Sequence, residues 1–265
     1  MEQLPAAAAY VAALAQSPFV RDLLAGHVTF EWSPTRMLSD DPAKGLGRAP
    51  EQAMLWHRLK DSMGAPQREL RLVSPYFVPG SAGVEALNAL AAQGVTVTVL
   101  TNALEATDVT AVHAGYAKRR RSLLAAGVAL FELKREAQRR PARSGERPGR
   151  FGSGSSGSSL HAKTFSVDRA RVFIGSFNFD PRSARLNTEM GFVIDSPTLA
   201  ETMAERFANA VPQRAYRVEL DESGKLRWID RQDGAEVVRG AEPGAGLWRR
   251  STIAFLAMLP IEWLL

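Results

Sequence analysis

Two hydrophobic periods alternate along the middle of the chain. Short runs rich in apolar and β-branched residues are typical of strands, and longer segments with apolar positions three or four apart are typical of helices. In chain order the segments are 68–73 (strand), 83–94 (helix), 95–102 (strand), 109–127 (helix) and 128–133 (strand). Both helical segments end at a glycine, which suits a left-handed helix cap. Strands that alternate with helices predict an α/β fold with a mixed, mostly parallel sheet flanked by helices.

The pattern continues in the second half of the chain. It predicts strands at 162–168, 171–176 and 190–195, a helix at about 197–210, and a hairpin with its turn near 222–224. Residues 134–159 are first basic and then rich in glycine and serine, a composition typical of a mobile loop. These patterns divide the chain into four predicted parts, which are 1–65 (helical or irregular), 66–215 (α/β domain), 216–247 (hairpin extension) and 248–265 (apolar C-terminal helix).

The last part of the chain has a different character from the rest. Residues 253–265 are apolar apart from Pro260 and Glu262, and Trp248 and Trp263 lie near the two ends. The segment is too short to span a bilayer. Two interpretations stay open: the helix lies in a membrane interface with the neighbouring arginines toward lipid phosphates, or it docks on the domain.

Composition narrows the possible partners and chemistry. With 33 Lys and Arg against 28 Asp and Glu, the formal charge is +5 and the isoelectric point is near 9.8, which favours anionic partners. The chain has no cysteine, so disulfides, thiolate catalysis and cysteine metal sites are excluded. The first residues include Glu2 and Pro5 and lack a basic start, a poor match to a signal peptide. No apolar window predicts a transmembrane helix.

The candidate chemistry lies around a histidine and a lysine two residues apart. His161 and Lys163 are predicted on one strand, where side chains at i and i+2 share a face. The pair suits a phosphate group, because the ammonium can bind its oxygens and a neutral imidazole can attack phosphorus. Ser176 and Asn178 follow the next strand, where a hydroxyl and an amide can hydrogen-bond phosphate oxygens.

Two carboxylates complete the candidate set. Glu189 is a candidate to orient the imidazole through its second nitrogen, as carboxylates do in catalytic triads. Asp168 follows a predicted strand, a position where an aspartate is also common as a turn residue. We therefore keep two hypotheses for Asp168, a structural one and a catalytic one.

The spacing of these residues resembles a known signature. His161, Lys163, Asp168, Ser176 and Asn178, with the intervening glycine, fill the pattern H-x-K-x4-D-x6-G-S-x-N. This pattern resembles the HKD motif of the phospholipase D superfamily. The stretches "SPYFVPG", "TNALEATDVTAVHAGY" and "LPIEWLL" are similar to the bacterial cardiolipin synthase C branch, and the resemblance covers nearly the whole chain.

The resemblance implies a fold, a mechanism and a position for each residue. It implies a phospholipase D-like domain at 66–215, with the His161 strand central and the site at strand ends, and a connector at 1–65. It implies that the histidine attacks a phosphodiester to form a phosphohistidine, with Glu189 as the carboxylate that partners the histidine. The histidine of a second motif protonates the leaving alcohol. The branch needs no metal or other cofactor.

The second motif implied by the resemblance is missing from this sequence. The other histidines, at 27, 57 and 113, do not fit the pattern, although His113 leaves open an approach from a neighbouring loop. We expect an incomplete C-terminal half. Two other hypotheses stay open: a homodimer that brings two copies of His161 together, or pairing with a separate N-terminal half.

The leading functional hypothesis is a phosphatidyltransferase of bacterial phospholipids, similar to cardiolipin synthase and peripherally associated with the cell membrane. Its partners are then a phospholipid substrate and the membrane surface. The alternative is a single-motif phosphodiesterase or nuclease that works as a homodimer, which the basic charge favours and the apolar tail disfavours. A third hypothesis is a non-catalytic half-enzyme that only associates with a membrane or a partner.

Overall fold

The structure is a computed structural model, and it describes residues 11–12, 14–135, 160–232, 234–244 and 246–258. Two compact units divide the chain, residues 1–33 and residues 34–265. In the first unit, helix α2 (Pro18–Leu24) starts with a proline, whose fixed φ suits the first helical turn. The predicted helix over residues 1–26 is thus confirmed in part, and its first ten residues lie outside the described residues.

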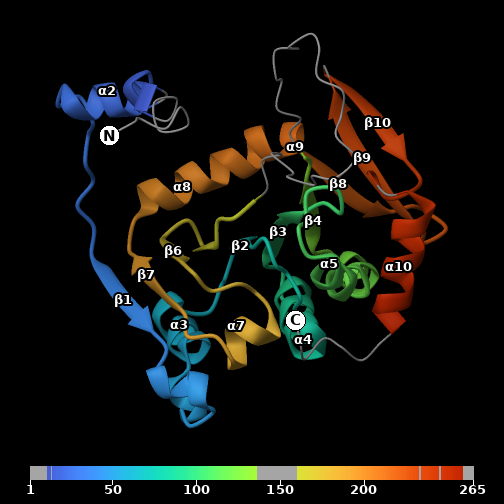
Figure 1. The fold of residues 1–265 in the computed structure, drawn as a ribbon, viewed down its shortest axis with the longest axis horizontal. Helices are drawn as coiled ribbons and strands as arrows, with labels where there is room; N and C mark the ends of the chain where they lie inside the picture. Colours follow the sequence, from blue (N-terminus) through green and yellow to red (C-terminus); the bar gives the residue numbers. More distant parts are fainter. Residues whose placement is uncertain (1–10, 13, 136–159, 233, 245, 259–265) are drawn as a thin grey trace, which may run out of the picture. The chain divides into compact units, whose positions relative to one another are not determined.

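The second unit is built on one ten-stranded sheet (Figure 1). In spatial order the strands are β1 (Thr35–Ser39), β7 (Met190–Ile194), β6 (Arg171–Gly175), β5 (Thr164–Val167), β2 (Glu69–Val73), β3 (Thr96–Asn102), β4 (Ala129–Leu133), β8 (Ala215–Leu220), β9 (Leu226–Gln232) and β10 (Ala235–Arg239). Strand β5, which follows His161, lies inside the sheet between β6 and β2. The expectation that this strand is central is confirmed.

The expectation of a mostly parallel sheet is wrong. Among the described strands only β2–β3 and β3–β4 pair in parallel, and every other neighbouring pair is antiparallel. Parallel pairing of adjacent strands needs a long crossover, and helices supply these crossovers from β2 to β3 (α4) and from β3 to β4 (α5 and α6). Short turns instead connect β5 to β6, through Asp168–Ala170, and β8 to β9. Short turns produce antiparallel neighbours.

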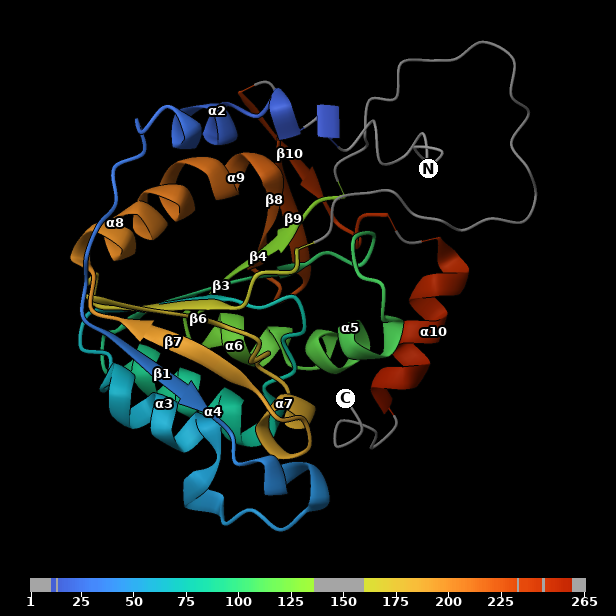
Figure 2. The same ribbon diagram turned by 60° about the vertical axis from the view of Figure 1, so that its left-hand side comes forward.

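Helices cover both faces of this sheet, and Figure 2 shows α8 and α9 on one side and α3, α4 and α6 on the other. The helical elements of the second unit are η1 (Pro42–Leu46), η2 (Glu51–Ala53), α3 (Leu55–Met63), α4 (Gly80–Ala92), α5 (Thr110–Ala117), α6 (Arg120–Ala125), α7 (Pro181–Arg185), α8 (Pro197–Glu205), a π-helical turn (Arg206–Ala210), α9 (Val211–Arg214) and α10 (Leu247–Met258). None of the described helices is long and apolar enough to cross a membrane.

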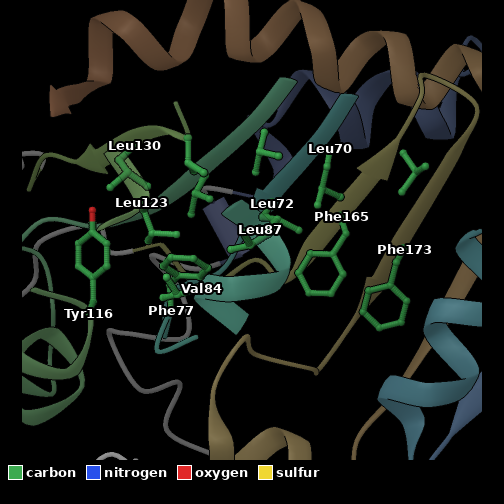
Figure 3. Packing of buried hydrophobic residues seen from close by; sticks show 14 of the residues in the cluster. Leu70, Leu72, Phe77, Val84, Leu87, Tyr116, Leu123, Leu130, Phe165 and Phe173 are labelled. Carbon is green, nitrogen blue, oxygen red and sulfur yellow. The ribbon is translucent and has the colours of Figure 1, made fainter. Parts of the chain in front are cut away.

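Alternation along the strands divides the core into two layers. Leu70 and Leu72 of β2 point toward α4 and pack in the larger cluster, in which the rings of Phe165 and Phe173 stack with centroids 5.2 Å apart (Figure 3). Val73 points to the opposite face and joins the cluster under α8 and α9. Both faces of the central strands are therefore buried, which explains their nearly continuous apolar sequences.

The predicted hairpin is present, and it continues the main sheet. Leu220 of β8 pairs with Leu226 of β9, and β8 also pairs with β4, so residues 216–247 do not form a separate extension in the described structure. At the other edge, β1 pairs with β7, which places residues 34–65 in the same compact unit as the domain. The expected division at residue 65 thus differs from the unit boundary at Pro34.

The C-terminal helix is docked on the domain. Ile253 of α10 is buried against Leu104 and Ala114, so α10 packs along α5 (Figure 1). This contact favours the docked interpretation for residues 247–258. The end of the tail, 259–265, and residues 136–159 of the loop predicted at 134–159 lie outside the described residues.

Candidate active site

Strand register brings the candidate residues to one edge of the sheet. Strand β5 runs antiparallel to β2, with Thr164 opposite Val73, so the residues before β5 lie beside the loop that follows β2. Strand β6 ends at Gly175, opposite Gly191 of β7. The residues after β6 and before β7 therefore lie at this same edge, which collects His161, Lys163, Ser176, Asn178 and Glu189.

The sequence had predicted His161 and Lys163 on a strand, but in the structure both residues lie just before β5. The ladder with β6 ends where Gly175 N–H donates to the Lys163 carbonyl at 3.2 Å. Two more hydrogen bonds hold Leu160. Its N–H donates to the carboxamide oxygen of Asn102 at 3.0 Å, and its carbonyl accepts from the carboxamide nitrogen of Asn102 at 3.3 Å. Hydrogen bonds therefore hold the main chain on both sides of the pair, although neither residue belongs to strand β5.

The two side chains remain together in this position. Lys163 Nζ lies 3.5 Å from His161 Nε2 and donates to the His161 carbonyl at 2.9 Å. His161 is exposed and Lys163 is half-buried. The imidazole is therefore accessible to a substrate, and the ammonium stands where it can bind the oxygens of a phosphate under attack.

Two glycines allow the strands behind the site to approach closely. A Cβ at Gly175 would collide with the Met190 carbonyl, and a Cβ at Gly191 would collide with the Phe173 ring. Gly175 therefore serves close strand packing at the end of β6.

Glu189 is buried behind His161 and Lys163, and its carboxylate accepts hydrogen bonds from two hydroxyl groups. Ser176 Oγ donates to one carboxylate oxygen and Ser183 Oγ to the other, the second at 2.8 Å. Ser183 Oγ in turn accepts from the Asn178 N–H at 3.2 Å. In the described structure Glu189 thus joins the two loops of the site, and its predicted bond to the imidazole stays a prediction.

Beneath Glu189 lies a buried ion pair that the sequence reasoning missed. Lys44 Nζ lies 2.6 Å from Asp40 Oδ2, and both side chains have no exposed surface. The Asp40 carboxylate also accepts from Glu189 N–H at 2.9 Å and from Leu55 N–H at 2.6 Å. Lys44 donates to the Ser183 carbonyl at 2.8 Å. The sequence held only one sign of this ion pair, which is an aspartate and a lysine four residues apart in a segment that has no hydrophobic periodicity.

Asn178 is nearly buried, and its carboxamide oxygen has no hydrogen-bond partner in the described structure. Buried polar atoms are usually paired, so this oxygen is an acceptor that a group bound beside it can use. A hydroxyl of the substrate is a matching donor.

Carboxylates shape the electrostatics around Lys163. Partial burial lowers the pKa of Lys163, and the charges of Glu189, Asp180 and Asp108 oppose this change. Burial also raises the pKa of Asp180, although the Ser183 N–H bonded to its carboxylate works in the other direction. Several carboxylates thus surround the Lys163 ammonium, which limits how strongly the site attracts a free anion.

Asp168 lies at the other end of β5. Its carboxylate accepts the N–H groups of Gln67 at 2.9 Å, Arg68 at 2.7 Å and Glu69 at 2.9 Å. Its backbone is left-handed, with φ of 52°. Four strand residues separate it from Lys163, which is roughly 15 Å along an extended chain. The structure does not bring Asp168 to the other candidates, and these contacts favour the structural hypothesis.

His113 has a different environment from His161. It is buried on α5, where its Nε2 lies 2.6 Å from Glu242 Oε1 and 2.6 Å from Arg120 Nη2. Arg120 also pairs with the buried Glu132, 3.0 Å from its Nε. These contacts describe a packed helix histidine that ties α5 to the segment before α10.

In the sequence, the loop after β2 contributed only to the family resemblance. Ser74 Oγ accepts from the Phe179 N–H at 3.0 Å, and Val78 N–H donates to the Phe179 carbonyl at 2.8 Å. Tyr76 Oη lies 2.9 Å from Asp108 Oδ2. The loop therefore adds a tyrosine and an exposed carboxylate to the same edge of the sheet.

Comparison with known families agrees with this geometry. The family described as "Cardiolipin synthase, PLD-like domain" matches residues 59–211. This range includes all the candidate residues predicted from the sequence, but not the buried pair of Asp40 and Lys44. The chain belongs to this phospholipase D-like family. Within the described residues, no group of three or more histidine, aspartate or glutamate side chains is arranged to hold a metal ion.

Individual relatives of this phospholipase D-like chain are bacterial. It is 46% identical over 256 residues to cardiolipin synthase C of Escherichia coli (strain K12), covering 97% of this chain and 53% of that protein. It is 34% identical to an uncharacterized protein of Helicobacter pylori (strain J99) over 49% of this chain and 24% of that protein. The chain thus spans about half the length, or less, of the curated relatives it matches.

Among solved structures, the chain is similar to the phospholipase D family member Nuc from Salmonella typhimurium. The identity is 18%, the TM-score is 0.48, and the match covers 71% of this chain and 99% of that one. It is also similar to phosphatidylserine synthase of Haemophilus influenzae Rd KW20, with 16% identity, a TM-score of 0.48, and 75% and 44% coverage.

Proposed function

We propose that this chain supplies one half of the active site of a phosphatidyltransferase, in which His161 attacks a phospholipid phosphodiester. The observation that carries the proposal is the pair of side chains at the sheet edge, with Lys163 Nζ 3.5 Å from the exposed His161 Nε2. The similarity to cardiolipin synthase C supports a phospholipid as the substrate class.

The first step transfers the phosphatidyl group to the protein. The lone pair of His161 Nε2 forms a bond to phosphorus, and the bond from phosphorus to the leaving alcohol oxygen breaks. Lys163 binds non-bridging oxygens, whose negative charge grows in the transition state. The leaving oxygen takes a proton from a general acid, which we propose to be a second histidine outside this chain.

The second step reverses the first with a new alcohol. The acceptor hydroxyl attacks phosphorus, its proton passes to the base formed in the first step, and the P–N bond breaks to restore His161. General acid–base catalysis typically contributes about 10²–10⁴-fold in rate. The chain on its own is therefore expected to be slow, and a second copy or the other half of a longer protein is the partner we propose.

The covalent adduct provides the test. The purified chain is mixed with vesicles of phosphatidylglycerol and phosphatidylethanolamine, denatured at neutral or alkaline pH to preserve the P–N bond, and analysed by mass spectrometry for a phosphatidyl group on His161. The adduct should be absent in His161→Asn and strongly reduced in Lys163→Met. The matched control is His57→Asn, because His57 is a partly exposed histidine paired with Glu51 on another part of the domain.

Two results would contradict the proposal. One is no adduct on His161 either with the chain alone or in the presence of a separately produced N-terminal half of a relative. The other is an adduct that forms equally in His161→Asn. Light scattering on the same samples shows whether a dimer or the added half accompanies adduct formation. A single-stranded oligonucleotide in place of the vesicles tests the nuclease hypothesis in the same assay.

A further inference from the structure

Tyr76 and Asp108 form a hydrogen-bonded pair in the two loops that follow the parallel strands β2 and β3. The phenol oxygen lies 2.9 Å and 3.1 Å from the two carboxylate oxygens of Asp108. Parallel strands end at the same edge of a sheet, and β5 starts at that edge opposite the end of β2. The pair therefore stands on the same edge as His161 and Lys163.

Main-chain bonds fix the tyrosine loop against the loop that carries Asn178. Val78 N–H donates to the Phe179 carbonyl at 2.8 Å, and Phe77 and Phe179 form a parallel bridge. The Tyr76 side chain is partly buried against Val78 and Val112. Tyr76 thus has a fixed position beside the phosphate-binding groups, although it takes no part in the phosphoryl chemistry described above.

The pair presents acceptors for hydrogen bonds. Burial, with the charge and hydrogen bond of Asp108, raises the pKa of Tyr76 to about 12, so the phenol keeps its proton and donates it to Asp108. Asp108 is exposed, and its carboxylate has lone pairs beyond the one that Tyr76 uses. A ligand that binds here must donate hydrogen bonds, as a hydroxyl or an ammonium group does.

The neighbouring ammonium of Lys163 favours the neutral donor. The negative charge of Asp108 acts on Lys163, so it is already offset in part by a cation of the protein. An ammonium ligand would have to approach the same ammonium side chain, whereas the hydroxyls of an alcohol meet no such repulsion. A polyol next to a phosphate is therefore the chemical group that suits both the pair and its neighbour.

We infer that Tyr76 and Asp108 are specificity-determining residues that bind the hydroxyl groups of the alcohol next to the reacting phosphate. This inference rests on the proposed function, because it assigns a role in the same site. Tyr76 holds the carboxylate in place, and Asp108 accepts a hydrogen bond from a hydroxyl of a glycerol-like head group. The pair then favours a polyol over water as the group that enters or leaves the site.

Binding of small phosphate esters to the purified chain tests the inference without requiring catalysis. Ligand-observed NMR titrations compare glycerol 1-phosphate, methyl phosphate and phosphoethanolamine. The wild-type chain should bind glycerol 1-phosphate about tenfold more tightly than methyl phosphate, which is the scale of one good hydrogen bond to a charged group. The ratio of the two affinities is the readout, because a change of net charge affects both esters alike.

Three variants give the inference its controls. Tyr76→Phe and Asp108→Asn should each reduce the ratio to within about twofold of one while methyl phosphate still binds. Tyr216→Phe is the matched control, since Tyr216 Oη donates to Glu105 at 2.9 Å in a similar tyrosine–carboxylate pair, and it should leave the ratio unchanged. Circular dichroism confirms that each variant is folded.

The outcomes separate this inference from the proposed function. Methyl phosphate binding that does not depend on Lys163, tested with Lys163→Met, would overturn the proposed phosphate site. Lys163-dependent binding with no preference for glycerol 1-phosphate would overturn the role of Tyr76 and Asp108 alone. A preference for phosphoethanolamine over methyl phosphate that is lost in Asp108→Asn would overturn the choice of a neutral polyol.

Discussion

The two ends of strand β5 each use a carboxylate, but in different ways. At the carboxyl end, Asp168 accepts three backbone N–H groups and closes a turn. At the amino end, Glu189 accepts two side-chain hydroxyls and lies over the buried pair of Asp40 and Lys44. The first arrangement fixes only main chain, whereas the second fixes side chains around an exposed imidazole. The stretch from His161 to Glu189 therefore contains one carboxylate that shapes the fold and another that shapes the site edge.

The largest effect that separates the two ends is expected at Asp40. In Asp40→Ala, Lys44 stays buried without its partner, and loss of one member of a buried ion pair costs about 3–5 kcal/mol. The free energy of unfolding from urea denaturation measures this loss. The matched control is Asp195→Asn, which weakens exposed contacts with Arg36 and Arg171 and should cost less than about 1 kcal/mol. Equal effects of the two variants would contradict the prediction.

A smaller loss is expected at the opposite end of the strand. Asp168→Ala removes the acceptor of three N–H groups and places alanine at a φ of 52°, so we expect a loss of about 2 kcal/mol in the free energy of unfolding. Asparagine tolerates this backbone conformation and keeps one acceptor oxygen, so Asp168→Asn should lose less. Neither variant should change the yield of the His161 adduct. A loss of adduct in folded Asp168→Asn would restore the catalytic hypothesis for Asp168.

The contribution of Asp168 should also depend on pH. Burial alone would raise its pKa, but the N–H groups of Glu69, Arg68 and Gln67 lower the pKa below the ordinary value of 3.8. The unfolded chain therefore binds the proton first as the pH falls. The stability that the carboxylate contributes is complete above about pH 5 and decreases as the pH falls through the folded pKa.

The measurement is the difference in unfolding free energy between the wild-type chain and Asp168→Asn at several pH values. The difference should be constant near neutral pH and should shrink below about pH 4. A difference of the same size at pH 2 and pH 7 would show that the charge of Asp168 does not stabilise the turn.

The sequence predicted the parts of this molecule that depend on local pattern. Short apolar runs identified the central strands. The spacing from His161 to Asn178 predicted residues that the structure brings to one sheet edge, because β5 and β6 are adjacent and joined by a tight turn. The parallel sheet was a wrong extrapolation from β2–β4 to strands with short connections. Asp40 and Lys44 were missed because their role depends on the pairing of β1 with β7, about 150 residues apart in the chain, which no local period reveals.

The smallest predicted effect concerns the charge of Glu189. Removing this charge should strengthen the binding of phosphate but reduce the yield of the His161 adduct. Glu189→Gln keeps an acceptor for one serine but removes a negative charge close to Lys163, so methyl phosphate should bind about threefold more tightly, a Coulomb effect of under 1 kcal/mol near a partly exposed site. NMR titration measures this gain, and it should shrink at 1 M salt.

The control variant Asp168→Asn removes the same charge at the far end of β5 and should leave methyl phosphate binding unchanged. If Glu189→Gln gains phosphate affinity but loses the His161 adduct, Glu189 organises the attacking imidazole, since a purely electrostatic role would have favoured both. Equal gains in the two variants would instead show that the net charge of the domain, and not the position of Glu189, governs the binding of phosphate.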